Sequence, residues 1–592
     1  MQNIGPQGQF AGRLIAGAIQ GVTLYFLYEA YEAHSAVAAN GFIFAPLVIL
    51  ALFIPLAVSQ GLGNLRNATL AIWIAAAAAV IAGFAVYDIW HGWPTERVFI
   101  HSQSETLPRN LPAFGTFFFS GVFLFIAQAL VIAGDAEKKF IAAYPSYFDT
   151  AWKQGLQFAL AGVFVGVFWA LLWLGAALFK LIDLDFLEKL IEHRWFAIPA
   201  TTLAIAAALH VTDVRANLVR GARSLVLALF SWLLLLIVVI AAGFLFSLVF
   251  TGLAPLWKTR MATNLLLTAA ASLAVLINAA YQDGDEERRP VKILRLASSL
   301  GGVLLLPIVT LAAYATYLRI AQYGWTADRI SAVAVIVVAA SYAVGYAIAA
   351  LAPKAWLKRI EIWNVATSFL VLVIIAALFS PLADPMRIGV ASQLARLESG
   401  KVAPEKFDVW YLRHEGGRFG KETLEKLSKS PNATLAANAK TALASEAGYR
   451  TLPEQKPEPV DLAARIRVYP AGAKLPDSFL KQDWKRDPST MPCLASGIFE
   501  GWHCTAILRN APQTEVVLVY GDDAPGDYKQ IVLFRETDGV WTAISRFDGK
   551  LCGREYSDLL TGKFETATPI QPDLVVAGRR VAMQPTPAGE CK

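Results

Sequence analysis

Cysteine is almost absent from this chain of 592 residues, and all four cysteines lie in its last hundred residues. Charged residues are also scarce, at 17% of the chain, whereas soluble domains have about 25%. Hydrophobic residues make up 56% of the chain, and the mean hydropathy is +0.47. These shortages exclude an ordinary soluble globular protein. They predict a membrane protein whose thiols are confined to one terminal part.

Long apolar runs account for the high hydropathy. A bilayer crossing needs about 20 mostly apolar residues in series. Stretches of this kind lie near residues 13–29, 42–59, 69–87, 114–134, 156–179, 196–211, 224–250, 262–280, 299–318, 330–352 and 364–383. A soluble core helix could imitate one of them, but not eleven in series. We therefore predict an α-helical polytopic membrane bundle of about eleven spans over residues 1–383, with the first stretch kept as a helix and not cleaved as a signal peptide.

Acidic residues are missing from the interior of these stretches. Among the few polar residues that lie within them are Gln20, Gln128, His210 and Asn278. An ionisable residue inside a span usually marks an ion or proton path, so the shortage argues against a proton- or sodium-driven carrier. Several stretches are interrupted by proline, at Pro46, Pro55, Pro199 and Pro307. Such prolines kink helices for packing or, in transporters, help to line a site.

Small residues spaced four apart predict where helices cross closely. Gly162 and Gly166 have this spacing, and so do Ser341, Gly345 and Ala349. Small side chains allow two helix backbones to approach each other within a membrane. We expect both sets to lie at close helix contacts.

Lysine and arginine predict the orientation, because cytoplasmic loops carry an excess of both. With a cytoplasmic N-terminus, the inner loops hold 15 of these residues and the outer loops hold 9. An odd number of spans then places the C-terminal part outside the cytoplasm. Basic residues are not clustered into one patch, as a nucleic-acid surface would require, so no nucleic acid is expected as a partner.

The cysteines agree with this orientation, because disulfides persist outside the cytoplasm and are rare within it. Of the three pairings open to four cysteines, we prefer the sequential one. It joins Cys493 to Cys504 and Cys552 to Cys591. Free buried thiols are the alternative. A zinc site would need closer pairs of cysteines with histidine nearby, so no metal is predicted.

The composition changes after residue 383. Residues 384–448 show the spacing of short amphipathic helices, and residues 449–465 form a linker rich in proline and charge. Residues 466–592 contain short β-branched and aromatic runs separated by turn sequences. We predict a small helical juxtamembrane layer followed by a small, mostly-β soluble domain outside the cytoplasm.

Catalytic signatures are missing as well. The chain has no phosphate-binding Walker loop, no Gly-x-Ser-x-Gly elbow and no His-Glu-x-x-His helix. The catalytic residues are therefore unknown, no cofactor is predicted, and the sequence does not favour an enzyme.

One tight turn between two late stretches is the candidate functional segment. It contains Arg319, Tyr323, Gly324, Trp325, Thr326, Asp328 and Arg329. Thr326 or Asp328 would cap the next helix. Arg329 would lie in the first turn of that helix, where a positive charge opposes the helix dipole. This position indicates a partner, such as a lipid phosphate or a carboxylate. An ordinary interfacial anchor of aromatic and basic residues is the alternative.

The same turn, "YGWTADRI", resembles the motif region of a bacterial family of multi-pass membrane proteins, domain of unknown function 4153. There a Tyr-Gly-Leu-Thr-like turn with a following arginine joins two late spans, and Trp325 stands here in the leucine position. The resemblance covers about residues 40–385. It implies the multi-pass architecture in a bacterial inner membrane and points to the turn. It implies no reaction and no substrate.

Three classes of function remain open. The favoured one is an inner-membrane protein that presents a disulfide-bonded periplasmic domain as an envelope interaction or regulatory module. Its partners would be membrane lipids and a periplasmic or membrane protein. The second class is a transporter or lipid-handling protein that uses the proline-broken helices. The least favoured is a membrane-surface enzyme built from His101, Arg319, Asp328 and Arg329.

Overall fold

The structure is a computed structural model of the chain. The residues that it describes are 6–92, 95–100, 103–108, 110–214, 216–253, 256, 261–285, 290–352, 356–444, 462–470, 472–482, 484, 491, 494, 502–509, 515–522, 528–537, 539–550, 553–560, 574–576 and 579–581. The chain divides into two compact units, Met1–Arg450 and Thr451–Lys592. The predicted linker falls largely outside the described residues.

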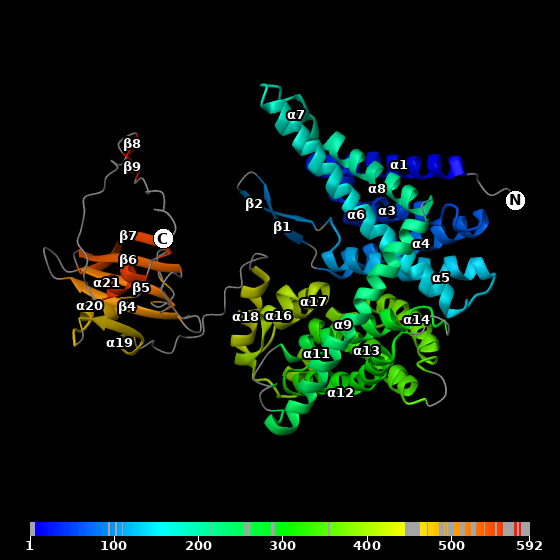
Figure 1. The fold of residues 1–592 in the computed structure, drawn as a ribbon. Coiled ribbons are helices and arrows are strands. Elements are labelled where there is room, and N and C mark those ends of the chain that lie inside the picture. The colour runs from blue at the N-terminus through cyan, green and yellow to red at the C-terminus, as the bar shows by residue number, and fades with distance from the viewer. Residues whose placement is uncertain are drawn as a thin grey trace. The chain divides into compact units, whose positions relative to one another are not determined.

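The first unit contains the membrane bundle (Figure 1). Eleven of the described helices are long and apolar enough to cross a membrane. They are α1 (Pro6–Glu32), α3 (Gly41–Gly61), α4 (Asn67–His91), α5 (Phe114–Glu137), α6 (Tyr144–Lys180), α8 (Arg194–Val214), α9 (Ala216–Thr251), α11 (Ala262–Tyr281), α12 (Lys292–Tyr323), α13 (Ala327–Ala350) and α14 (Ile360–Leu378). Large apolar side chains face outward, such as Val239, Val249 and Phe250 on α9, as lipid-facing helices require. The predicted polytopic bundle is confirmed.

A closed ring of three hydrogen bonds joins α11, α13 and α14 inside the bundle. The Tyr346 hydroxyl donates to Asn364 Oδ1 at 2.6 Å. Asn364 Nδ2 donates to Asn278 Oδ1 at 2.6 Å, and Asn278 Nδ2 donates to the Tyr346 oxygen at 2.5 Å. Tyr346 is fully buried. Because each member both donates and accepts within the ring, Asn278 has a structural role.

The ends of the long helices lie on two faces of the bundle. On the first, Arg13 near the start of α1 donates to the carbonyl oxygens of Ser59 and Leu62 at the end of α3. On the second, His91 at the end of α4 contacts Asp384, which follows α14. We call these the N-terminal face and the C-terminal face. Helix α1 begins on one and α14 ends on the other, as an odd number of crossings requires.

A layer of short helices follows α14 and completes the first unit. It consists of α15 (Pro385–Glu398), the 3-10 turn η1 (Pro404–Lys406), α16 (Val409–His414), α17 (Gly417–Leu427) and α18 (Ala433–Ala444). These helices have their own core, centred on Leu412, Leu424 and Ala439. The remaining described elements of the unit are α2 (Ala36–Ala39), α7 (Phe186–Glu192) and the hairpin of β1 (Thr95–Ile100) and β2 (Gln103–Pro108).

The second unit is the predicted small β-domain. Its sheet has the order β3 (Ile466–Tyr469), β4 (Trp502–Arg509), β5 (Glu515–Asp522), β6 (Tyr528–Thr537) and β7 (Val540–Lys550). Strand β3 runs parallel to β4, and the other neighbours are antiparallel. Short helices α19 (Leu462–Arg465), α20 (Asp477–Lys481) and α21 (Gly553–Leu560) and the pair β8 (Leu574–Val576) and β9 (Arg579–Val581) accompany it.

Aromatic side chains fill the core of the β-domain. The ring of Phe479 on α20 meets the rings of Phe534 and Trp541 edge to face, with centroids 5.8 and 5.2 Å apart. Cys504 on β4 lies in the same core and is 1% exposed. The other three cysteines lie outside the described residues.

One of the two predicted small-residue contacts is confirmed, and the other is wrong. A Cβ atom added to Gly345 on α13 would lie 2.2 Å from Cγ of Trp363 on α14, so only glycine fits this crossing. A Cβ atom added to Gly162 or Gly166 on α6 would meet nothing within 4 Å among the described residues. The spacing is the same, but the glycines of α6 do not face a neighbouring helix.

We therefore predict opposite outcomes for two glycine-to-alanine substitutions. Gly345→Ala forces the Trp363 ring away and should lower the free energy of unfolding by about 1–3 kcal/mol, the usual range for overpacking. Gly162→Ala should be neutral or slightly stabilising, because alanine is the better helix former. Thermal unfolding of both variants in the same detergent measures the difference. Equal melting temperatures would show that the α13–α14 crossing is not as close as described.

Candidate functional site

The predicted functional turn joins α12 to α13 on the C-terminal face. Gly324 has φ +78°, a conformation that glycine adopts without strain. Helix α15 lies against the turn and bonds its backbone. Gln393 Nε2 donates to the carbonyl oxygens of Tyr323 and Trp325 at 3.0 and 2.8 Å. The Trp325 N–H donates to Ser392 Oγ at 3.1 Å.

Two more contacts extend this attachment. Arg396 Nη2 of α15 donates to the Gln322 carbonyl at 2.8 Å, and the Ala327 N–H donates to the Tyr411 hydroxyl oxygen of α16 at 3.3 Å. Burial raises the pKa of Tyr411 to about 12, so its hydroxyl stays neutral. The turn is therefore a docking point for the juxtamembrane helices.

Arg329 has partners inside the turn. Its Nη1 donates to the Gly324 carbonyl at 2.5 Å, and its guanidinium lies 5.5 Å from the centroid of the Tyr323 ring. The Arg319 guanidinium lies 6.0 Å from the same ring. These contacts give the arginine partners within the turn itself. Thr326 occupies the N-cap position of α13, but its side chain makes no capping hydrogen bond. A binding or catalytic role for this turn stays a prediction.

A buried polar cluster on the C-terminal face centres on Asp384, which is not among the site residues predicted from the sequence. Asp384 caps α15, where its Oδ1 accepts from the N–H groups of Met386 and Arg387 at 2.8 and 3.0 Å. Its Oδ2 accepts from the Tyr87 hydroxyl at 2.5 Å and contacts His91 Nδ1 at 2.9 Å. Asp384 is 0% exposed. The sequence Asp384-Pro385 predicts the start of a helix. No local sequence feature predicts the contacts of Asp384 with α4.

A second carboxylate extends the cluster through the histidine. His91 Nε2 lies 3.4 Å from Asp88 Oδ1, and Asp88 Oδ2 accepts from the Ala113 N–H at 2.7 Å. Each ring nitrogen of His91 therefore faces a carboxylate, and a doubly protonated ring would donate to both. We call Tyr87, Asp88, His91 and Asp384 the carboxylate clamp. It joins α4, the start of α5 and the start of α15.

Hydrogen bonds keep the buried Asp384 ionised. Burial alone raises the pKa of this carboxyl. The hydrogen bonds from His91, Tyr87 and the Arg387 backbone outweigh burial and hold the pKa below its usual range. A buried charge is tolerated only when it is paired and hydrogen-bonded in this way. The clamp therefore fixes the helical layer to the bundle.

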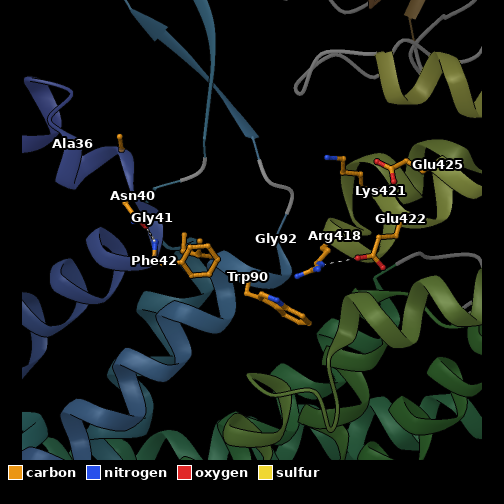
Figure 2. A pocket seen from close by; sticks show the side chains of 12 residues that line it. Ala36, Asn40, Gly41, Phe42, Trp90, Gly92, Arg418, Lys421, Glu422 and Glu425 are labelled. Atoms are coloured by element: carbon orange, nitrogen blue, oxygen red, sulfur yellow. Dashed lines mark hydrogen bonds and ion pairs between the residues drawn. The ribbon is translucent and has the colours of Figure 1, made fainter.

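A cavity of about 660 Å³ lies next to the clamp in the chain, because its lining includes Trp90 and Gly92 on either side of His91. Figure 2 shows the side chains that line this cavity. We call it the interfacial groove. Its lining comes from α2, the start of α3, the end of α4 and one side of α17. The lining residues are Ala36, Ala39, Asn40, Gly41, Phe42, Ile89, Trp90, Gly92, Arg418, Lys421, Glu422 and Glu425. The start of α17 touches α4 closely: a Cβ atom on Gly417 would lie 2.3 Å from the His91 carbonyl oxygen. The clamp therefore helps to hold α17, one wall of the groove, against α4, which forms another wall.

The groove combines aromatic and charged side chains. The Arg418 guanidinium lies 4.7 Å from the centroid of the Trp90 ring, and its Nε donates to Glu422 Oε1 at 2.9 Å. Figure 2 shows Arg418 between these two side chains. Phe42 is 51% exposed and Trp90 is 38% exposed. Aromatic and basic residues of this kind are typical of the boundary between membrane and water.

The groove presents aromatic and charged side chains, and the described residues of its lining include no serine, threonine or cysteine. No nucleophile in the groove is paired with a base. Within the described part of the chain, no three histidine, cysteine or acidic side chains gather as a metal site would require. His101, a residue of the least favoured enzyme alternative, lies outside the described residues.

Eleven apolar helices with a soluble terminal domain define a multi-pass membrane protein. The family model described as Domain of unknown function (DUF4153) matches residues 16–418, about two thirds of the chain, and the protein belongs to this family. The resemblance seen in the turn is confirmed, and the match extends beyond the expected 40–385 at both ends, from Ala16 in α1 to Arg418 at the start of α17. No curated protein and no solved structure matches the chain.

We predict that Asp384→Ala destabilises the protein far more than the loss of a helix cap alone. Removing one partner of a buried charged cluster typically costs about 3–5 kcal/mol. Asp408→Ala is the matched control, because Asp408 caps α16 through the Tyr411 N–H but is exposed, and a cap contributes about 1 kcal/mol. Thermal unfolding at pH 7 measures both, and equal losses would contradict the clamp.

The clamp also predicts a pH dependence. The folded-state pKa of Asp384 is lowered, so its stabilising effect is complete above the unfolded-state value of about 3.9. The effect is lost as the pH falls through the folded-state pKa. The difference in melting temperature between wild type and Asp384→Ala should therefore shrink as the pH is lowered below about 4. A difference that grows on acidification would show that the carboxylate is not the stabilising form.

Proposed function

We propose that the protein is an integral protein of the bacterial inner membrane that presents its β-domain in the periplasm as an envelope interaction or regulatory module. The observation that carries the proposal is the geometry of the first unit. Helix α1 begins on one face of the bundle, and α14 ends on the other. The excess of lysine and arginine, 15 against 9, favours the N-terminal face as the cytoplasmic one.

The attachment of the helical layer supports presentation of a module. Helix α15 bonds the α12–α13 turn through Gln393 and the end of α4 through Asp384. The helical layer that precedes the β-domain in the chain is therefore fixed to the bundle. The partners in this proposal are membrane lipids and a periplasmic or membrane protein that binds the β-domain.

Disulfides are part of the same proposal. Cys504 lies buried in the β-domain core, and no described cysteine is free. The proposed pairing is Cys493 with Cys504 and Cys552 with Cys591. Closing a loop of about a dozen residues would stabilise the domain by roughly 3 kcal/mol in the chain-entropy description. Such bonds would persist in the periplasm but not in the cytoplasm.

Reporter fusions test the orientation. Alkaline phosphatase, which needs an oxidising compartment, should be active when fused after Lys592, and green fluorescent protein at the same position should be dark. The control is a fusion truncated after Arg66, on the N-terminal face, where the two reporters should behave in the opposite way. Fluorescence after Lys592 without phosphatase activity would overturn the proposed orientation. In the purified protein, a maleimide should label no thiol before reduction and four after it.

The interfacial groove favours a second candidate function, lipid handling. Arg418 and Lys421 stand at its rim, and the N-terminus of α3 points into it, where Asn40 caps the helix. Cations and a helix N-terminus attract phosphate, and the exposed Trp90 and Phe42 suit the upper part of an acyl chain. Glu422 and Glu425 line the same groove and balance the two positive charges, so the groove fits the phosphate and upper acyl region of a phospholipid without a preference for an anionic one.

Native mass spectrometry of the detergent-purified protein tests the groove. Arg418→Gln combined with Lys421→Gln should reduce retention of added phosphatidylglycerol several-fold, because both positive charges leave the rim. Lys426→Gln is the control, since Lys426 lies on the same helix but does not line the groove, and it should retain lipid like the wild type. Equal retention by all three proteins would remove the support for lipid handling.

A further inference from the structure

A second cavity, on the N-terminal face, is lined mainly by polar side chains. Its volume is about 170 Å³, and it lies between the end of α3, α5 and the first turns of α6. Side-chain amides of Gln60, Asn64, Gln154 and Gln157 face it, together with Lys153. We call this cavity the amide chamber. It is distinct from the interfacial groove, which lies on the C-terminal face.

The amides of the chamber have unused hydrogen-bonding atoms. Seven buried side-chain nitrogen or oxygen atoms among the described residues lack a partner, and four of them line this one cavity. They are Gln60 Nε2, both amide atoms of Gln154, and Gln157 Oε1. These residues are 5%, 3% and 2% exposed. Burying an amide without a partner costs free energy, and such groups in a folded protein call for a water or a ligand.

Buried amides elsewhere in the bundle are satisfied. Gln128 Nε2 donates to the Ala57 carbonyl, and its Oε1 accepts from Trp73 Nε1. Gln20 donates to the Leu52 carbonyl. The ring of Asn278, Tyr346 and Asn364 is closed within itself. The gathering of unpaired amides around the chamber therefore differs from the rest of the membrane bundle.

The charges beside the chamber are already compensated. Lys153 Nζ lies 2.6 Å from Asp213 Oδ1 and donates to Asn64 Oδ1 at 3.1 Å. Arg13, 1% exposed, lies 2.5 Å from Asp213 Oδ2. At the mouth, Asp149 pairs with Arg223 at 2.5 Å. An anionic ligand would find no unpaired cation among these residues, and an apolar ligand would leave the amides unpaired.

The unpaired groups of the chamber are two amide donors and two amide acceptors around a small space. Hydroxyl groups match this set, because each one can donate and accept. The volume admits several waters or one small solute. The side chains of Lys153 and Asp149 are 36% and 55% exposed, so the mouth opens at these residues while Gln154 and Gln157 form the buried floor. We propose that the amide chamber binds a small neutral polyol, of the size of glycerol or erythritol.

Saturation-transfer NMR on the full-length protein in detergent tests this proposal. The probes are glycerol and erythritol, with glycine betaine and inorganic phosphate as zwitterionic and anionic comparisons. The wild type should transfer saturation to the polyols and not to the other two. Gln154→Leu should reduce the polyol signal at least fivefold without lowering the melting temperature, because it replaces unpaired polar atoms with an apolar side chain of similar size.

Gln128→Leu is the matched control. It should lower the melting temperature, because it removes a bonded amide and leaves Trp73 without its acceptor, but it should keep the polyol signal. Gln157→Leu provides a second test of the chamber floor. Three results would overturn the proposal. The first is no saturation transfer to either polyol, which would mean that the chamber holds water only. The second is transfer that is unchanged in Gln154→Leu, and the third is transfer confined to betaine or phosphate.

Discussion

The C-terminal face of this protein depends on one buried carboxylate. Asp384 receives hydrogen bonds from the Tyr87 hydroxyl, from the start of its own helix and, with a proton on Nδ1, from His91. The carboxylate is fully buried, so each of these donors compensates part of the cost of removing a charge from water. The contacts decide where α15 begins and how it lies against α4. The docking of α15 on the α12–α13 turn and the position of α17 in the interfacial groove follow from that placement.

Polar chemistry in the bundle is concentrated at its two ends. The clamp and the groove lie on one face, and the amide chamber lies on the other. The ring of Asn278, Tyr346 and Asn364 lies toward the N-terminal face as well, because its members stand within four residues of the ends of α11, α13 and α14. A proton or ion path would need ionisable groups midway between the two faces. The distribution favours binding at the two ends of the bundle, in agreement with the proposed lipid-handling role of the interfacial groove.

The sequence was sufficient for features that depend on neighbouring residues. Hydropathy predicted the eleven spans, and alternation with turn residues predicted the β-domain, because both signals are local. It could not distinguish Gly345 from Gly162, since the spacing is the same and only the packing shows which helix face meets a neighbour. It also could not pair Asp384 with His91, 293 residues earlier. Gln128 and Gln154 look alike in sequence, yet one is bonded and the other is not.

Hydrogen exchange followed by mass spectrometry tests the central claim that α15, the first helix of the helical layer, is fixed to the bundle. The N–H groups of Met386 and Arg387 are bonded to Asp384, and those of Trp325 and Ala327 are bonded to Ser392 and Tyr411. The account predicts that peptides covering residues 322–328 and 384–396 exchange as slowly as peptides from the interior of α12 and α13. Exchange of these peptides as fast as that of an unprotected surface segment would contradict it.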